Sequence, residues 1–304
     1  MTIRLGIAPI GWTNDDLPEL GGDIPLERCL REARQAGYAG VEKGGKFPSD
    51  PKLLKPVLAD HDLALVSGWF SGGLLESGKV DDEKGRIGAQ LDLFLAMGCP
   101  VIVYAETTGT VQAKLEIPVA DRTKLRPDEL RRYGEKLSRL ADWLKAEGCP
   151  MTFHHHMGTV VETEADVDLL MEATDPASVG LLFDTGHLTF ADGDVPGTLR
   201  RHAARVNHVH AKNIRPEVLE RLKKERWSFL KGVKEGVFTV PGDRDGCVDF
   251  REVAKILKEV GYAGWIVVEA EQDPDKANPL EMAETGFQEL TAACREAGLT
   301  LAAA

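Results

Sequence analysis

The stretch Glu259-Val-Gly-Tyr-Ala-Gly-Trp-Ile-Val-Val-Glu269 ends an amphipathic helical pattern at a glycine and begins an apolar strand a few residues later. The same unit recurs around Gly37, Gly98 and Gly148. Glycine commonly ends helices because it adopts the left-handed conformation without a Cβ clash. The short connection that follows is typical of helix-to-strand loops in parallel sheets. The repeat therefore predicts a parallel α/β fold.

Working outward from these units gives eight strands that alternate with helices. The predicted strands cover residues 3–9, 40–44, 63–69, 101–106, 151–156, 179–184, 206–211 and 265–270. The predicted helices lie near residues 24–36, 51–60, 83–97, 127–147, 164–174, 195–203, 249–260 and 279–297. Strict alternation of eight βα units favours a closed (β/α)8 TIM barrel over an open doubly wound sheet.

The length of 304 residues suits one barrel, and no shift in composition marks a linker, so we predict a single domain over residues 1–304. Two connections after strands are long, near residues 107–126 and 214–248. In a barrel such loops lie over the C-terminal face and often form lids. We expect both segments to cover the site.

Composition limits the classes of partner. Apolar residues make up 43% of the chain and charged residues 28%, as in a globular protein. The formal net charge of −12 opposes binding to nucleic acid or to an anionic membrane. A small neutral substrate is the expected ligand, and the sequence leaves open whether the chain forms a homo-oligomer.

The cysteines and the N-terminus bear on location. The five cysteines lack CxxC spacing, which indicates reduced and mostly buried thiols. The N-terminal residues lack a signal-peptide pattern, and no apolar run is long enough to span a membrane. We therefore expect a cytoplasmic protein.

Imidazoles and carboxylates end four predicted strands of the C-terminal half. Because side chains alternate across a strand, Asp184, His210 and Glu269 would all face the barrel mouth. Burying this many ionisable groups without a cation would be expensive. The three residues form a mixed nitrogen and oxygen set that Mn²⁺, Co²⁺ or Zn²⁺ tolerates.

Three motifs in this half resemble the xylose-isomerase-like barrel superfamily of metal-dependent isomerases, epimerases and dehydratases. They are Leu-Leu-Phe-Asp184-Thr-Gly-His187, His208-Val-His210-Ala-Lys212-Asn213 and Val-Val-Glu269. The opening segment Gly6-Ile-Ala-Pro-Ile-Gly-Trp12-Thr-Asn14-Asp15 narrows the match, together with Glu42-Lys-Gly-Gly-Lys46 and His154-His-His156-Met-Gly-Thr-Val-Val-Glu162. With these the chain resembles the inosose dehydratase family from end to end.

The resemblance implies a reaction and its cofactors. It implies dehydration of 2-keto-myo-inositol (scyllo-inosose) to 3D-(3,5/4)-trihydroxycyclohexane-1,2-dione in inositol catabolism. Mn²⁺ or Co²⁺ would serve as the cation, with a link to glutathione. Asp184, His210 and Glu269 fall on the superfamily's ligand positions.

The fourth ligand stays open between two residues. Many superfamily members have a glutamate near the end of the fifth strand, where this chain has His154. Glu162 lies eight residues farther along and could fold back. Position favours His154, whereas a hard oxygen ligand for Mn²⁺ favours Glu162.

Four ionisable residues on the same rim are candidates for proton transfer. Loss of water from a β-hydroxy ketone needs a base for the proton beside the carbonyl and an acid for the departing oxygen. We expect His156 or Glu271 to act as the base and His187 or Lys212 to assist the leaving hydroxyl. Lys212 could instead only neutralise carboxylates, and His187 could cap a helix.

Five further residues are candidates for binding the cyclitol. Trp12 could stack on the ring, with Asn14 and Asp15 reading hydroxyls. Lys46 could bind a hydroxyl or the ketone, and Asn213 ends the motif of the seventh strand. Trp12 could equally pack in the barrel floor, and Lys46 could be a solvated rim lysine.

Three other functions compete with dehydration. A keto-sugar or keto-cyclitol isomerase or epimerase would use the same ion but return the proton to carbon. A superfamily member that cuts DNA at abasic sites would need a basic groove, which the net charge opposes. A non-catalytic sugar-binding barrel would not need so many ionisable groups on one rim.

Overall fold

A ring of eight parallel strands forms the centre of the protein, whose computed structural model describes residues 2–302. The strands are β1 (Thr2–Ile7), β2 (Gly40–Lys43), β3 (Ala64–Gly72), β4 (Ile102–Glu106), β5 (Met151–His154), β6 (Gly180–Asp184), β7 (Val206–Ala211) and β10 (Gly264–Val268). Each pairs with the next along the chain, and β10 pairs with β1 to close the ring. A short strand, β11 (Thr300–Leu301), adds to β1 outside the ring. The predicted TIM barrel is confirmed.

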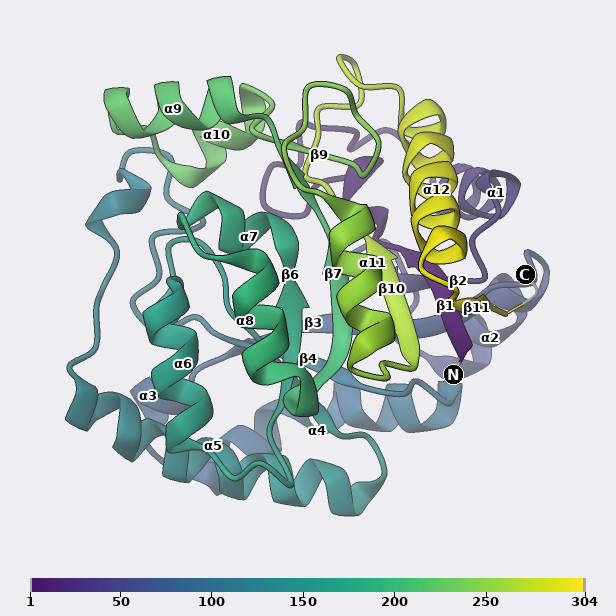
Figure 1. Cartoon of the computed structure of the whole chain (residues 1–304). Helices are drawn as coiled ribbons and strands as arrows, with labels where there is room; N and C mark the ends of the chain where they lie inside the picture. Colours follow the sequence, from purple (N-terminus) through teal and green to yellow (C-terminus); the bar gives the residue numbers. More distant parts are fainter. Residues whose placement is uncertain (1, 303–304) are drawn as a thin grey trace.

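Helices surround the ring, and all eight predicted ones are present (Figure 1). They are α1 (Leu26–Ala36), α2 (Pro51–Ala59), α4 (Val80–Met97), α5 (Pro127–Glu147), α6 (Glu164–Ala173), α8 (Val195–His202), α11 (Phe250–Glu259) and α12 (Pro279–Glu296). Gly37 and Gly148 cap α1 and α5 with φ of 110° and 99°, and their amides close the last helical turns. Among residues 2–302 no helix is both long enough and apolar enough to cross a membrane.

The segment 214–248 differs from the long loop that we predicted. It contains α9 (Pro216–Glu225) and α10 (Phe229–Lys234), flanked by the antiparallel pair β8 (Asn213–Ile214) and β9 (Phe238–Thr239). These elements lie beyond the tips of the strand arrows, over the C-terminal face (Figure 1). Their apolar side chains form a second hydrophobic cluster with Met157 and Phe190. Burial of that cluster explains why the segment is ordered as helix.

Other short helical elements also lie outside the prediction, and three of them follow strands of the ring. They are α3 (Leu74–Ser77), α7 (Thr185–Phe190) and the 3-10 turn Pro9–Gly11. The segment 107–126 is irregular, as expected, apart from one 3-10 turn at Val119–Asp121. Thr110 Oγ1 donates a hydrogen bond to Gly158 O, which ties this loop to the one after β5.

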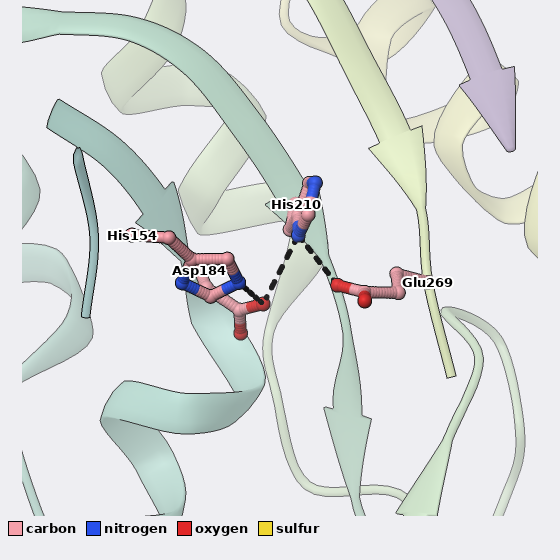
Figure 2. A group of neighbouring side chains, drawn as sticks. All are labelled: His154, Asp184, His210 and Glu269. Atoms are coloured by element: carbon pink, nitrogen blue, oxygen red, sulfur yellow. Dashed lines mark ion pairs between the residues drawn. The ribbon is translucent and has the colours of Figure 1, made fainter. Parts of the chain in front are cut away.

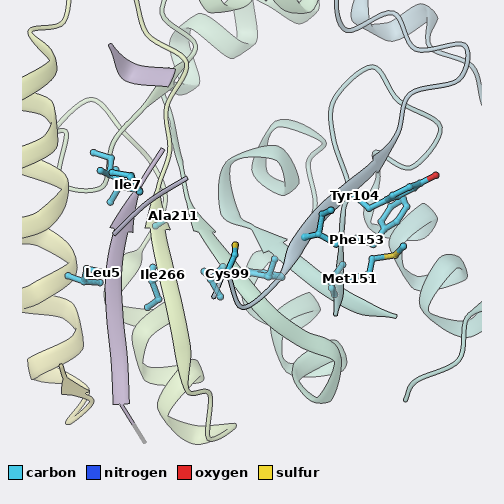
Figure 3. Packing of buried hydrophobic residues seen from close by; sticks show 14 of the residues in the cluster. Leu5, Ile7, Cys99, Tyr104, Met151, Phe153, Ala211 and Ile266 are labelled. Carbon is cyan, nitrogen blue, oxygen red and sulfur yellow. The ribbon is translucent and has the colours of Figure 1, made fainter. Parts of the chain in front are cut away.

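Apolar side chains pack both outside and inside the ring of strands. Leu5, Ile7 and Ile266 point outward into the main core between strands and helices (Figure 3). A small separate cluster, which includes Val66, Trp265 and Val267, fills the lower barrel interior. Above this floor the inward-facing residues change from apolar to ionisable. The fold therefore places a buried polar site directly above the apolar floor of the barrel.

Close helix packing gives a stability prediction. A Cβ on Gly134 in α5 would lie 2.4 Å from Ala173 O, whereas a Cβ on Gly88 in α4 would meet nothing within 4 Å. Gly134→Ala should therefore lower stability by about 1–3 kcal/mol, the usual range for overpacking. Gly88→Ala should raise stability by up to about 1 kcal/mol, because alanine favours a helix interior. Thermal midpoints of the two variants provide the test, and equal shifts would contradict the packing of α5 against α6.

Candidate metal centre

Four side chains from consecutive strands converge inside the C-terminal mouth of the barrel. His154 and Asp184 end β5 and β6, His210 lies on β7, and Glu269 follows β10 directly. The strand register places Asp184 opposite His210. One ligand atom from each of the four residues lies within 4.8 Å of the others. Figure 2 shows His210 between the two carboxylates.

The distances define a compact group. Asp184 Oδ2 lies 3.9 Å from His154 Nε2 and 3.5 Å from His210 Nδ1. His210 Nδ1 lies 2.5 Å from Glu269 Oε2. All three strand-borne residues are at most 2% exposed. The Glu269 side chain is 13% exposed and lines a cavity, so the group is buried but can be reached from one side.

The converging atoms are the ones that the surrounding protein leaves unsatisfied. Asp184 Oδ1 accepts the amide of His187 at 2.7 Å, but Oδ2 has no hydrogen-bond partner. His210 Nδ1 and Glu269 Oε2 contact each other at 2.5 Å, and neither has a hydrogen-bond partner among the other surrounding groups. His154 Nδ1 lies 2.6 Å from the backbone oxygen of His155, which can only accept a hydrogen bond. The ring proton is therefore on Nδ1, and Nε2 presents a lone pair. Such buried atoms are costly unless a shared cation satisfies them, and these residues fit one.

The charges of the group are tightly linked. Burial opposes protonation of His210, but the Glu269 and Glu42 carboxylates outweigh it and raise the pKa of His210 well above its usual value. Burial also lowers the pKa of His154 far below the ordinary range, with His210 adding to the effect. The site thus attracts positive charge, yet His154 offers a neutral imidazole.

Lys212 lies between the four converging residues and a second group of side chains, which consists of His156, His187 and Glu271. Its Nζ lies 2.8 Å from Glu271, 3.0 Å from His187 Nε2 and 3.4 Å from Glu269. Burial disfavours its ammonium, but Glu269 and Glu271 outweigh burial and raise the pKa of Lys212. His156, His187 and Glu271 could also hold a cation by their spacing. The Lys212 ammonium already supplies the positive charge there.

Glu271 and His156 are the ionisable members of that second group that face open space. Burial raises the pKa of Glu271 to about 7, against the opposing charge of Lys212. Burial, reinforced by Lys212, lowers the pKa of His156 to about 3, so its ring is neutral. His156 Nδ1 lies 2.9 Å from Met157 O, which leaves Nε2 as an acceptor.

A cavity of about 380 Å³ opens above the two groups. His156, Glu269 and Glu271 form its deep side. The residues toward its other walls include Asp15, Asp16, Lys43, Trp69, Thr107, Thr110 and Gln112. A volume of this size suits a single small ring, and polar side chains outnumber aromatic ones.

Glu162 lies apart from the four converging residues. Its carboxylate accepts the amide of Gly158 at 2.7 Å and pairs with Arg122 at 3.2 Å. Both carboxylate oxygens are therefore engaged in holding the loop after β5. Of the two residues considered for the fourth position, the structure brings His154 to the group.

Four of the five expected substrate-binding residues lie elsewhere. Trp12 is 1% exposed, and its indole N–H donates to Glu32 at 2.7 Å. The Asn14 side-chain oxygen accepts two amides of its own turn, and Lys46 Nζ donates to nearby backbone carbonyls. Asn213 accepts three backbone amides. Among the five only Asp15 lines the cavity, and it also accepts the amide of Gly45 at 2.8 Å.

Several cavity residues were missed from the sequence, and three of them lie on predicted strands. Trp69 on β3 lies with its ring centroid 5.4 Å from that of His156. Lys43, the last residue of β2, lines the cavity where we had considered Lys46. Glu42 lies beside Lys43 and contacts His210. A signal was available, because each of these residues lies in or at the end of a predicted strand.

Known proteins match the chain over nearly its whole length. The xylose isomerase-like TIM barrel family matches residues 30–293. The rhizopine catabolism protein MocC of Rhizobium meliloti is 47% identical over 304 residues, which cover 100% of this chain and 92% of that protein. The inosose dehydratase of Geobacillus thermodenitrificans is 44% identical over 293 residues, 96% of this chain and 97% of that enzyme. The inosose dehydratase of Lacticaseibacillus casei is 46% identical over 284 residues, 93% and 94% of the two chains.

Solved structures share the fold at much lower identity. An L-ribulose 3-epimerase superposes with a TM-score of 0.65 at 18% identity, covering 98% of this chain and 96% of that one. A D-allulose 3-epimerase of Methylomonas sp. gives 0.67 at 15% identity, with coverages of 96% and 97%. These structures bear on the fold alone. The higher identities with full-length enzymes show more than the fold. The chain belongs to the xylose isomerase-like TIM barrel family and, within it, to the hydro-lyase group of the inosose dehydratases.

Proposed function

We propose that the protein removes water from 2-keto-myo-inositol with the help of one divalent cation held by His154, Asp184, His210 and Glu269. The product would be 3D-(3,5/4)-trihydroxycyclohexane-1,2-dione. The observation that carries the proposal is the convergence of buried ligand atoms from four neighbouring strands beneath a cavity of about 380 Å³. The names of the inosose dehydratase relatives support the substrate and its place in inositol catabolism.

The donor set limits the choice of ion. Two imidazole nitrogens and two carboxylate oxygens suit Mn²⁺ or Co²⁺, with Zn²⁺ as a third option. Glutathione, which the family resemblance implied, finds no support in the described cavity lining and is not part of the proposal.

A bound divalent cation would polarise the ketone oxygen and so acidify the neighbouring C–H bond. Glu271 is placed to take that proton, because its carboxylate lines the cavity and Lys212 holds it at 2.8 Å. The net reaction releases water, so the proton on Glu271 can be returned to the departing hydroxyl. A carbon–carbon double bond forms as the C–O bond breaks, and tautomerisation gives the dione.

Other residues would position the ring. His156 Nε2 can accept a hydrogen bond from a substrate hydroxyl, because Nδ1 is engaged with Met157 O. Lys212 and His187 are fully buried, Lys212 donates to Glu271 and His187 Nε2 contacts Lys212, so we assign both to orienting Glu271 instead of to direct assistance of the leaving hydroxyl. Asp15, Lys43 and Gln112 offer hydrogen bonds toward the mouth, and Trp69 offers an apolar face.

Exchange of single ligands tests the cation site. His154→Ala should lower the affinity for Mn²⁺ by more than about 100-fold, since even supporting contacts to ligands contribute 10- to 100-fold. Glu162→Gln should bind Mn²⁺ as the wild type does, because its carboxylate contacts Arg122 and Gly158 instead. Calorimetric titration of the two variants with Mn²⁺ gives both values. The opposite pattern would make Glu162 the ligand.

Turnover of 2-keto-myo-inositol tests the reaction. The metal-loaded protein should produce an ultraviolet-absorbing dione, a chelator should abolish the activity, and added Mn²⁺ or Co²⁺ should restore it. Glu271→Gln keeps all four proposed ligands, so it should retain the ion while kcat falls by about 10²- to 10⁴-fold.

Two outcomes would count against dehydration. Exchange of the proton beside the ketone with solvent, without any ultraviolet product, would instead indicate an isomerase or epimerase. Full activity after complete removal of divalent ions would refute the role of the cation while leaving dehydration intact.

A further inference from the structure

Glu42 is a buried carboxylate to which the proposed reaction gives no role. It lies on β2 inside the barrel and is 7% exposed. Its Oε1 accepts a hydrogen bond from His210 Nε2 at 2.9 Å and lies 3.1 Å from His208 Nε2. The hydroxyl of Ser67 donates to the same oxygen. One carboxylate oxygen thus joins β2, β3 and β7.

The contact with His210 determines which of its nitrogens can bind a cation. An ionised carboxylate only accepts hydrogen bonds, so the ring nitrogen that faces it carries the proton. When a cation replaces the proton on Nδ1, His210 would keep its other proton on Nε2 and bind the ion through the lone pair of Nδ1. That atom is the one that faces Asp184 and Glu269.

The other histidine of the group is oriented by the same principle with a different partner. His154 Nδ1 lies 2.6 Å from the backbone oxygen of His155, which leaves Nε2 for the cation. Each imidazole therefore has its non-ligating nitrogen tied to an oxygen acceptor. Acceptors of this kind fix the orientation of metal-binding histidines and strengthen them as ligands.

Glu42 is itself held firmly in place. The pairing of β2 with β3 shifts between Val41 and Glu42, and this irregularity sets Glu42 opposite Ser67. His208 lies two residues before His210 on the same face of β7, so both rings reach one oxygen. These contacts hold the Glu42 carboxylate in one position as a hydrogen-bond acceptor.

We infer that Glu42 is the positioning residue of the cation site: its carboxylate fixes the proton of His210 on Nε2 and aims Nδ1 at the ion. The inference rests on the proposed function, because it assumes that His210 is a ligand. Glu42 would act through His210 without touching the ion.

Titration with Co²⁺, followed by its visible absorption, tests the inference without any activity measurement. Wild type should bind one equivalent. Glu42→Ala should lower the affinity by about 10- to 100-fold, as for other supporting contacts to ligands. Glu42→Gln should lose less, because the amide oxygen can still accept from His210. The spectrum of Glu42→Ala should shift more than that of Glu42→Gln, since only alanine removes the acceptor that orients His210.

A matched control separates positioning from general damage to the fold. Glu32 is also a buried carboxylate, at 7% exposure, but it bonds Trp12 and Arg28. Glu32→Gln should keep the wild-type affinity and spectrum. If Glu42→Ala does not fold, Ser67→Ala provides the second variant, with a smaller loss of affinity because only one support of Glu42 is removed.

The outcomes distinguish the two proposals. Wild-type affinity and spectrum in Glu42→Gln and in a folded Glu42→Ala or Ser67→Ala would overturn the inference and leave the cation site intact. A wild type that binds two equivalents and loses one in Glu42→Ala would make Glu42 a ligand, which also overturns it. A wild type that binds no Co²⁺, Mn²⁺ or Zn²⁺ would refute the cation site and the inference together.

Discussion

Excess negative charge inside the barrel is the constraint on which the rest of the site depends. Four carboxylates, from Glu42, Asp184, Glu269 and Glu271, lie within the upper barrel at no more than 13% side-chain exposure. One ammonium, from Lys212, lies among them and contacts three of the four. Buried charges need partners, and Lys212 together with a protonated His210 does not fully balance these carboxylates. A divalent cation beside Asp184 and Glu269 would resolve this imbalance, and the Glu42 carboxylate accepts hydrogen bonds from the imidazoles of His208 and His210.

Much of the fold could be predicted because its signals are local. Helix-ending glycines and short apolar strands recur with little variation, and the eight predicted strands and helices match those observed to within a few residues. The helices α9 and α10 were missed because they pack on residues far away in the sequence, such as Met157 and Phe190. Tertiary burial, rather than local pattern, stabilises that segment. The two-residue strands β8 and β9 depend on the same packing.

The same distinction applies to the candidate site, where residues on strands could be predicted and residues on loops could not. Residues on strands could be placed from the two-residue alternation of side chains, which brings Asp184, His210, Glu269 and His154 together. Residues on loops could not, because loop conformation decides where they point. Lys46 and Asn14 hold backbone turns, and Glu162 holds Arg122, although all three looked suited to ligand binding. Trp12 was a candidate ring-stacking residue, but the charged partner Glu32 fixes it in the core.

Anomalous diffraction from crystals of the Mn²⁺-loaded protein tests the central claim most directly. We predict a single peak per chain, within coordination distance of four ligand atoms. These atoms would be His154 Nε2, Asp184 Oδ2, His210 Nδ1 and Glu269 Oε2. A peak between His156, His187 and Glu271, or no peak inside the barrel, would contradict it.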